Sequence, residues 1–188
     1  MNRLAFYIGI ENLEEIKNMD NLYLKARLLA DLLFAEKKDK AGKPYVYHLY
    51  RVSDKMTTLE GKVAGLLHDV VEDIKTPDFP ELDVTFDDLR DIKIPEEIIE
   101  ALQLVTKTPP PTRFLSKQEK LNYYYQEIDT IIESKNLLAI ELKIADMSDN
   151  YNPERLKELP EEKKEWFTQK YSEPLKKLKL VKERMITC

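Results

Sequence analysis

The chain has 188 residues, 43% of them hydrophobic and only four of them glycine, which is enough to bury a sizeable core in one domain. Its formal net charge is −5, from 30 basic and 35 acidic residues. We expect no nucleic acid among its partners, because nucleic-acid binding depends on a basic face that neutralises phosphates. We also expect no membrane partner, because no apolar run is long enough to span a bilayer.

The first twenty residues, MNRLAFYIGIENLEEIKNMD, carry acidic residues soon after a short apolar stretch. They have no small-residue cleavage site and so differ from a signal peptide. The one cysteine, Cys188, has no second cysteine with which to form an internal disulfide. A cytoplasmic protein is the simplest interpretation, and the sequence leaves the oligomeric state open.

Helical periodicity runs through nearly the whole chain, and the alternation typical of strands persists nowhere. In chain order, we expect helices over residues 21–36, 45–56, 57–74, 85–92, 95–107, 116–134, 136–152 and 160–185. We expect the third to begin at Thr57 or Thr58, the fourth at a Thr85 cap, and the fifth with Pro95 in its first position. Pro174 is expected to kink or divide the last helix. We therefore predict a single all-α domain of roughly seven or eight helices.

The stretch GLLHDVVED at residues 65–73 places polar groups inside an apolar helix. In a continuous helix His68 and Glu72 are four residues apart, as are Asp69 and Asp73, so the four side chains share a face. The apolar neighbours leave little room for that face to be exposed to solvent. Buried carboxylates are costly unless a positive charge compensates them, and a divalent metal is a common compensation. Adjacent His and Asp ligands suit Mn²⁺, Fe²⁺ or Zn²⁺.

Two other predicted helices offer further ligands. His48, the only other histidine, lies one helix earlier, and an antiparallel arrangement would bring it to His68. Asp146 interrupts the apolar pattern of residues 137–150 where a core residue is expected. Each signal alone has a plainer explanation, such as a core histidine, an acidic solvent face, or a carboxylate paired with Lys143. Together, three separated helical sites favour a metal site.

The candidate ligands resemble the ligand set of the HD-domain superfamily of metal-dependent phosphohydrolases. Their order along the chain is His48, then the pair His68-Asp69, then Asp146. Three stretches are similar, more specifically, to the alarmone hydrolases, which are the (p)ppGpp-hydrolysing domains of the Rel/Spo type and their small single-domain relatives. These stretches are DKAGKPYVYHLYRV at 39–52, LLHDVVED at 66–73 and LKIADMSDN at 142–150. Residues 155–179 resemble the closing helices of that branch, so the likeness covers about residues 22–180.

The resemblance implies a compact multi-helix HD-domain fold and a 3′-pyrophosphohydrolase acting on (p)ppGpp, the nucleotide of the stringent response. It implies that His48, His68, Asp69 and Asp146 bind one divalent ion, usually Mn²⁺, with Fe²⁺, Zn²⁺ and Mg²⁺ as alternatives. It implies that Glu72 and Asp73 are the catalytic pair beside the metal, and that Lys40, Tyr45, Lys143 and Asn150 contact the substrate. No synthetase domain follows within the chain, so we expect a stand-alone hydrolase whose partner is a small-molecule nucleotide.

The chemistry of these residue types agrees with that activity. A metal lowers the pKa of bound water and neutralises charge that grows on phosphoryl oxygens. A carboxylate such as Glu72 can take the proton of that water or orient it. Lysines 37, 38, 40 and 43 form a basic loop in an acidic protein. The loop is either a solvated turn or a site for electrostatic capture of a polyphosphate.

Two positions depart from the family pattern. The basic loop of the alarmone hydrolases carries an Arg-Lys pair whose arginine packs on guanine, whereas this chain has Asp39-Lys40. Position 147 is Met where the branch often has a basic residue. Two alternatives therefore stay open: an HD phosphohydrolase that acts on another nucleotide or on a nicotinamide cofactor phosphate, and a non-catalytic module that binds nucleotide or protein. The complete ligand set with Glu72 and Asp73 argues against the second alternative.

Overall fold

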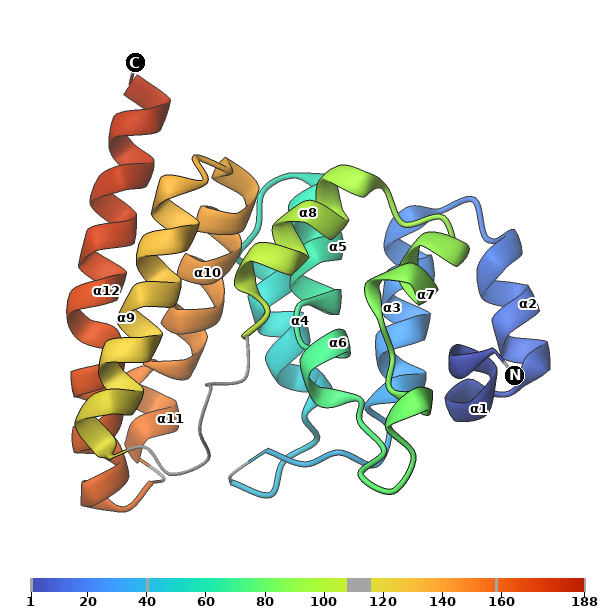
Figure 1. Ribbon diagram of the computed structural model, residues 1–188, viewed down its shortest axis with the longest axis horizontal. Helices are drawn as coiled ribbons and strands as arrows, with labels where there is room; N and C mark the ends of the chain where they lie inside the picture. Colours follow the sequence, from blue (N-terminus) through green and yellow to red (C-terminus); the bar gives the residue numbers. More distant parts are fainter. Residues whose placement is uncertain (1, 40, 108–115, 158, 188) are drawn as a thin grey trace.

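The computed structural model describes residues 2–39, 41–107, 116–157 and 159–187, and Figure 1 shows their arrangement. The helices are α1 (Arg3–Ile8), α2 (Ile10–Asn18), α3 (Leu22–Leu33), α4 (Val46–Asp54), α5 (Leu59–Leu67), α6 (Val70–Asp73), α7 (Phe86–Asp91), α8 (Glu96–Val105), α9 (Lys117–Glu133), α10 (Leu137–Asn150), α11 (Pro153–Lys157) and α12 (Glu161–Thr187), with a 3-10 turn at Pro80–Leu82. One isolated β-bridge joins Lys38 and Pro44. The predicted all-α class is confirmed.

Local capping determines where several helices begin. The Thr58 side chain accepts a hydrogen bond from the Gly61 backbone N–H at the start of α5. Thr85 and Ser116 form capping boxes at the starts of α7 and α9, so orphan N–H groups are satisfied in both helices. Pro95 is the N-cap of α8 rather than its first residue, one position away from the prediction.

The predicted continuous helix over residues 57–74 is wrong. Helix α5 ends at Leu67, a turn follows at His68 and Asp69, and the short helix α6 begins at Val70. The His68 imidazole explains the break: its Nδ1 lies 2.9 Å from the Gly65 carbonyl oxygen. A continuous helix would offer that oxygen to the backbone N–H of Asp69, so the side chain competes with the helix.

The last helix runs through Pro174 without being divided, unlike one outcome that the sequence suggested. Proline removes one backbone hydrogen bond from a helix interior. Pro174 is itself buried, and so are Tyr171 and Leu178 about one turn to either side of it. Packing of this face stabilises the helix in spite of the missing bond. The sequence also failed to predict α1 and α2.

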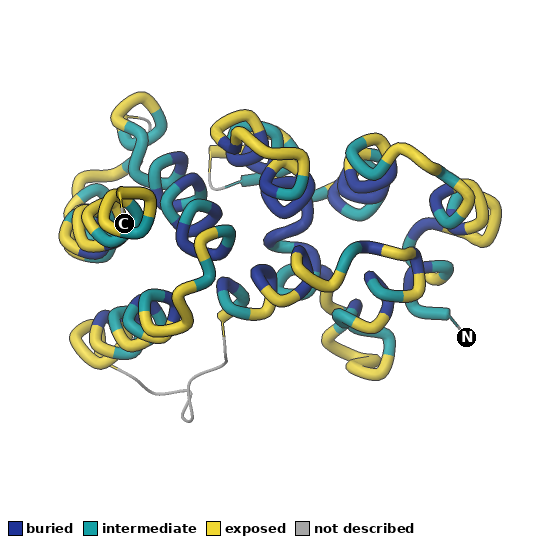
Figure 2. Tube along the Cα trace, turned by 90° about the horizontal axis from the view of Figure 1, so that it is seen from above, coloured by how far each residue is buried: buried dark blue, intermediate teal, exposed yellow. Residues whose placement is uncertain are grey.

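Helix α5 lies at the centre of the fold and contacts α3, α4, α8 and α10 (Figure 1). Six of its nine residues are buried, and Figure 2 shows the buried part of the trace in the interior of the molecule. Helices α9 and α12 cover the other side of α10, and α1 and α2 pack on α3 at the opposite end. This arrangement brings together the helices that carry the candidate site residues. Among the described residues, no helix has the length and apolarity needed to cross a membrane.

Candidate metal centre

Close packing of α4 on α5 brings the two histidines together. A Cβ atom at Gly65 would lie 2.7 Å from the backbone N and Cα of Ser53, so only glycine allows this approach. One turn from this contact, the rings of His48 and His68 lie with their centroids 5.2 Å apart and their planes tilted by 69°. Helices α4 and α5 are therefore neighbours that run in opposite directions, which is the arrangement expected to bring His48 to His68.

His48, His68 and Asp69 form a compact group of ligand atoms, all within 4.8 Å of one another. The Asp69 Oδ2 lies 3.1 Å from His68 Nε2 and 3.6 Å from His48 Nε2. Both imidazoles are buried, with 2% and 4% of their surface exposed. The break in the helix thus places the Asp69 carboxylate at the junction between α5 and α6, next to both imidazoles.

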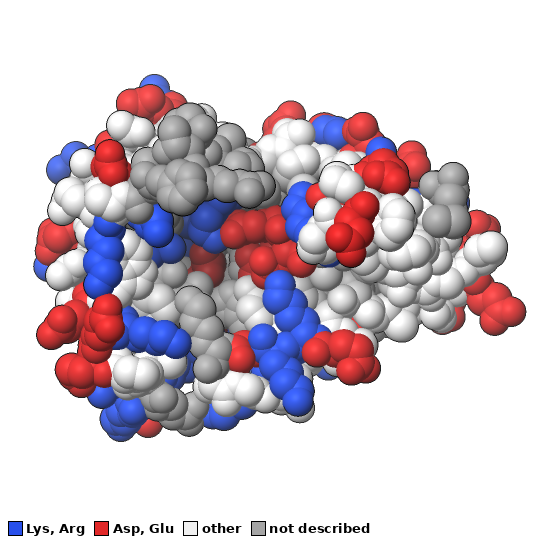
Figure 3. Space-filling view, turned by 60° about the horizontal axis from the view of Figure 1, so that its bottom comes forward, with Lys and Arg blue, Asp and Glu red and all other residues white. Residues whose placement is uncertain are grey.

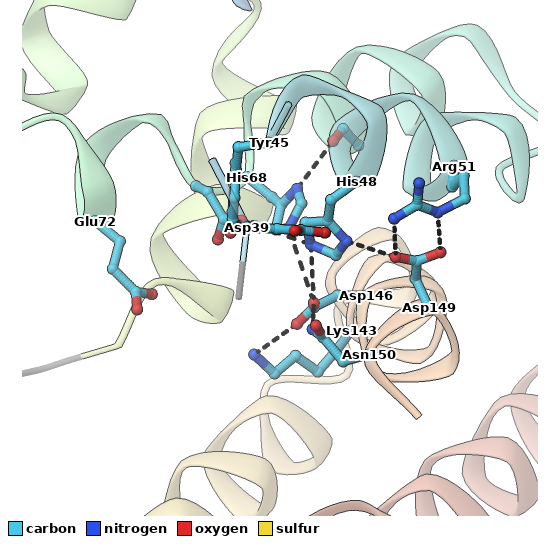
Figure 4. A network of polar contacts seen from close by, with 12 residues as sticks. Asp39, Tyr45, His48, Arg51, His68, Glu72, Lys143, Asp146, Asp149 and Asn150 are labelled. Carbon is cyan, nitrogen blue, oxygen red and sulfur yellow. Dashed lines mark hydrogen bonds and ion pairs between the residues drawn. The ribbon is translucent and has the colours of Figure 1, made fainter. Parts of the chain in front are cut away.

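Asp146 reaches the same place from α10. Its Oδ1 lies 3.5 Å from His48 Nε2 and 3.9 Å from His68 Nε2. Two neighbours on its own helix hold this carboxylate: Asn150 donates to Oδ1 at 2.5 Å, and the Lys143 ammonium lies 3.4 Å from Oδ2. The structure therefore gathers all four predicted ligand residues from three separate segments. Figure 4 shows three of them, His48, His68 and Asp146, close together.

The buried Nε2 of His68 tests whether these residues fit a metal ion. Among the described residues this nitrogen has no hydrogen-bond partner, although it lies close to two carboxylates. The Gly65 carbonyl takes the other ring nitrogen, so Nε2 is the nitrogen left to face the cluster. A buried polar atom without a partner is costly, and an ion bound there would satisfy it. Imidazole nitrogens with carboxylate oxygens are ligands of Mn²⁺, Fe²⁺ and Zn²⁺ alike.

Asp149 is a further candidate site residue, to which sequence reasoning gave no role. It is fully buried, and its Oδ2 lies 2.7 Å from Nδ1 of His48. Its carboxylate also accepts hydrogen bonds from Arg51 (2.7 Å from Nε to Oδ1) and from Arg155, and Lys55 lies 3.3 Å away. A signal was present, since Asp149 lies three residues after Asp146 on the same helix, where side chains share a face.

Charge pairing within the cluster shifts the pKa values of its members. Burial lowers the pKa of His48, but the Asp146 and Asp149 carboxylates outweigh burial and raise it. Burial opposes protonation of His68 too, yet Asp69 raises its pKa to about 9. Burial raises the pKa of Asp69 and Asp146, while the histidines and, for Asp146, chiefly Lys143 hold both pKa values well below the usual range. The centre thus favours ionised carboxylates, the form that binds cations, together with protonated imidazoles, which must lose a proton when a metal binds.

Glu72 and Asp73 do not join this cluster through a shared helical face, because the helix is broken between α5 and α6. Glu72 forms an ion pair with Lys107, and the Asp73 Oδ2 lies 2.8 Å from the Lys37 ammonium. Figure 4 shows the Glu72 side chain apart from the two imidazoles. Both carboxylates nevertheless line the cavity onto which the cluster opens.

That cavity has a volume of about 400 Å³. Besides the acidic residues, its lining includes the cationic side chains of Lys37, Lys38, Lys43, Arg51, Lys107, Lys143, Arg155 and Lys170. Figure 3 shows acidic side chains in the middle of a hollowed face, with basic side chains around them. The cavity can therefore attract an anion to its walls while its floor holds a cation.

The predicted substrate contacts fall into three groups. The Tyr45 hydroxyl donates to Asp69 Oδ2 at 2.5 Å, so this residue supports a candidate ligand as well as lining the cavity. Lys143 and Asn150 both hold Asp146, as described above, and line the same cavity. Lys40 lies outside the described residues.

Asp39 closes the basic loop. Its Oδ1 accepts hydrogen bonds from the backbone N–H groups of Ala41 (2.9 Å) and Lys43 (3.0 Å), an arrangement typical of aspartate in turns. Its Oδ2 lies 3.7 Å from the Arg155 guanidinium. The residue that departs from the family pattern thus organises the loop and brings it to an arginine from α11.

Fold and site together define an all-α protein with a His-His-Asp group, in which both histidines are buried, that could hold a metal ion. A search of family models found none that matches the chain.

Proposed function

We propose that this chain is an HD-type, Mn²⁺-dependent phosphohydrolase that removes the 3′-diphosphate from a (p)ppGpp-like nucleotide. The observation that supports it most is the buried, unpartnered His68 Nε2 among the described residues, which faces Asp69 and Asp146. The cluster opens onto a cavity with lysines and arginines in its walls. A cation site beside a cation-lined wall suits a substrate whose reacting group is a phosphate.

In this proposal a divalent ion supplies a water of lowered pKa and positive charge near the phosphoryl oxygens. The protein side chains do the rest. Glu72 and Asp73 line the cavity as carboxylates that can take the proton of the attacking water, and their lysine partners hold them in place. Tyr45 orients Asp69, and Asn150 orients Asp146, through the hydrogen bonds already described. The surrounding cations bind the phosphates of the substrate.

A second candidate is a phosphohydrolase of the same type that acts on another nucleotide or on a nicotinamide cofactor phosphate. The observation that favours it is Asp39, because its carboxylate is engaged in the turn of the basic loop and in an ion pair with Arg155. An aspartate in this position offers no cation to stack on guanine. A non-catalytic nucleotide-binding module is less well supported, because it needs neither Glu72 nor Asp73 in the cavity.

The test is incubation of the purified protein and Mn²⁺ with a panel of nucleotides, with products separated by chromatography. We expect GDP and pyrophosphate from ppGpp with the wild type and none with Asp69→Ala. Asp91→Ala, which changes an exposed aspartate on α7, is the matched control and should retain activity. Cleavage of a different nucleotide only would favour the second candidate. Mn²⁺ binding without cleavage of any nucleotide would favour the non-catalytic module.

A further inference from the structure

Tyr124 on α9 carries another buried polar atom that has no partner among the described residues. The residue is 4% exposed, and among the described residues its hydroxyl has no hydrogen-bond partner. It lines the cavity above the candidate metal centre. Burying a hydroxyl without a hydrogen bond costs free energy. A group that enters the cavity and accepts a hydrogen bond would remove this cost.

Two ammonium groups lie beside the Tyr124 ring. The Nζ of Lys170 is 4.5 Å from the ring centroid, and the Nζ of Lys143 is 5.8 Å from it. Lys170 also lies 5.2 Å from the ring centroid of Tyr171, which makes an edge-on contact with Tyr124. Both lysines line the same cavity. Two positive charges thus lie close to the ring that carries the unpartnered hydroxyl.

The donors at this wall suit a phosphate. A lysine ammonium has three N–H donors and no acceptor, and a tyrosine hydroxyl at neutral pH can donate one hydrogen bond. A phosphate offers several anionic acceptor oxygens, whereas a base or a sugar offers neutral acceptors together with donors that ammonium groups cannot accept. Lys143 is buried and pairs with Asp146, so an anion bound by Lys143 would lie next to the metal centre.

We propose that Tyr124, Lys143 and Lys170 form a subsite for the terminal phosphate of a diphosphate or longer polyphosphate. The subsite lies on the wall of the cavity that α9, α10 and α12 form. This proposal rests on the proposed function, because it takes the metal centre to act on the neighbouring phosphate. It narrows the substrate class to esters that carry at least two linked phosphates. A monophosphate ester would leave either the metal centre or this wall without a phosphate.

In the test, the full chain is first treated with a chelator and then titrated with inorganic pyrophosphate in an isothermal titration calorimeter. Circular dichroism checks that each variant is folded. Tyr124→Phe removes only the unpartnered hydroxyl. We expect it to weaken pyrophosphate binding by roughly 10- to 100-fold, the effect of one lost hydrogen bond to a charged group. The melting temperature should stay the same or rise, because the fold loses no hydrogen bond. Lys170→Met should weaken binding at least as much.

Matched controls lie on the same two helices. Tyr125→Phe removes the neighbouring hydroxyl, which donates to the Gln169 carbonyl oxygen, and Lys176→Met removes an exposed lysine of α12. Neither should change the affinity for pyrophosphate. If Tyr124→Phe binds pyrophosphate as tightly as the wild type, the hydroxyl serves water or the fold and the proposal is overturned.

This experiment is independent of turnover, so the two proposals fail separately. Weakened pyrophosphate binding by Tyr124→Phe in a protein that cleaves no nucleotide would retain the subsite and refute the phosphohydrolase. Cleavage of ppGpp by Tyr124→Phe with an unchanged KM, together with unchanged pyrophosphate affinity, would refute the subsite and retain the phosphohydrolase.

Discussion

Asp149 and His48 form a hydrogen bond of 2.7 Å between Oδ2 and Nδ1 that links α10 to α4 across 101 positions of the chain (Figure 4). The carboxylate accepts from Nδ1, so Nε2 is the ring nitrogen that faces Asp69 and Asp146. Histidine ligands of metals commonly have such a partner, which fixes the ring orientation and increases basicity. Burial raises the pKa of Asp149, but the hydrogen bond from His48, together with Arg51 and Arg155, outweighs burial and holds the pKa below the usual range, so the carboxylate stays ionised.

Replacement of Asp149 should therefore weaken metal binding. We expect Asp149→Asn to lower the affinity for Mn²⁺ by about 10- to 100-fold, the usual effect of losing a partner of a ligand histidine. Titration with Mn²⁺, followed by electron paramagnetic resonance of the free ion, measures this affinity. Asp91→Asn is the control, and urea unfolding separates a loss of affinity from a loss of stability. Wild-type affinity in a folded Asp149→Asn protein would show that Asp149 has no such role.

Metal binding should stabilise the folded chain, because an ion that binds only the native state shifts the folding equilibrium. At a free Mn²⁺ concentration of 100 times the dissociation constant, the free energy of unfolding should increase by about 2.7 kcal/mol. Thermal unfolding with added Mn²⁺, and again after a chelator, measures the gain and its reversal. His68→Ala should show no gain. An equal gain in His68→Ala would place the ion elsewhere.

Glu72 should matter for turnover and not for metal binding, because its carboxylate pairs with Lys107 and lies apart from the imidazoles. We expect Glu72→Gln to bind Mn²⁺ like the wild type and to lose 10²- to 10⁴-fold in kcat, the usual contribution of a general base. Glu97→Gln, at an exposed position of α8, is the control. Unchanged turnover would remove Glu72 from the mechanism, whereas loss of the metal would identify it as a ligand.

Asp39 should influence substrate affinity through its charge. Asp39→Asn keeps an acceptor oxygen for the two loop N–H groups but removes the negative charge near Arg155. We expect the KM for ppGpp to fall by up to roughly fivefold, which corresponds to the loss of an ion pair worth up to about 1 kcal/mol. Steady-state kinetics measures this change. An unchanged or higher KM would show that Arg155 does not contact the substrate.

Asp39→Arg is a stricter version of the same experiment. The substitution supplies the cation that the resembled family stacks on guanine, but it loses both hydrogen bonds that close the loop. We expect improved cleavage of ppGpp relative to other nucleotides if stacking outweighs loop closure. The comparison with Asp39→Asn separates the two effects, because only the arginine adds a stacking surface.

Helix positions could be predicted from the sequence wherever local contacts determine them. The Thr85 and Ser116 capping boxes satisfy backbone N–H groups within one turn, so α7 and α9 begin where the sequence indicates. The break at His68 could not be predicted in the same way. The break depends on whether the His68 imidazole or the Asp69 backbone N–H donates to the Gly65 carbonyl oxygen. Packing of the imidazole among α4, α5 and α10 decides between these two donors.

The sequence by itself determined the helical class and the chemical types of the candidate ligands, because periodicity and capping act between residues a few positions apart. The tertiary structure decided which of these groups meet. It brings His48, His68, Asp69 and Asp146 to one place. It pairs Glu72 and Asp73 with lysines and forms the hydrogen bond between Asp149 and His48. It also leaves the Tyr124 hydroxyl without a partner among the described residues. These relationships join distant segments, and close packing of the helices, not local preference, determines them.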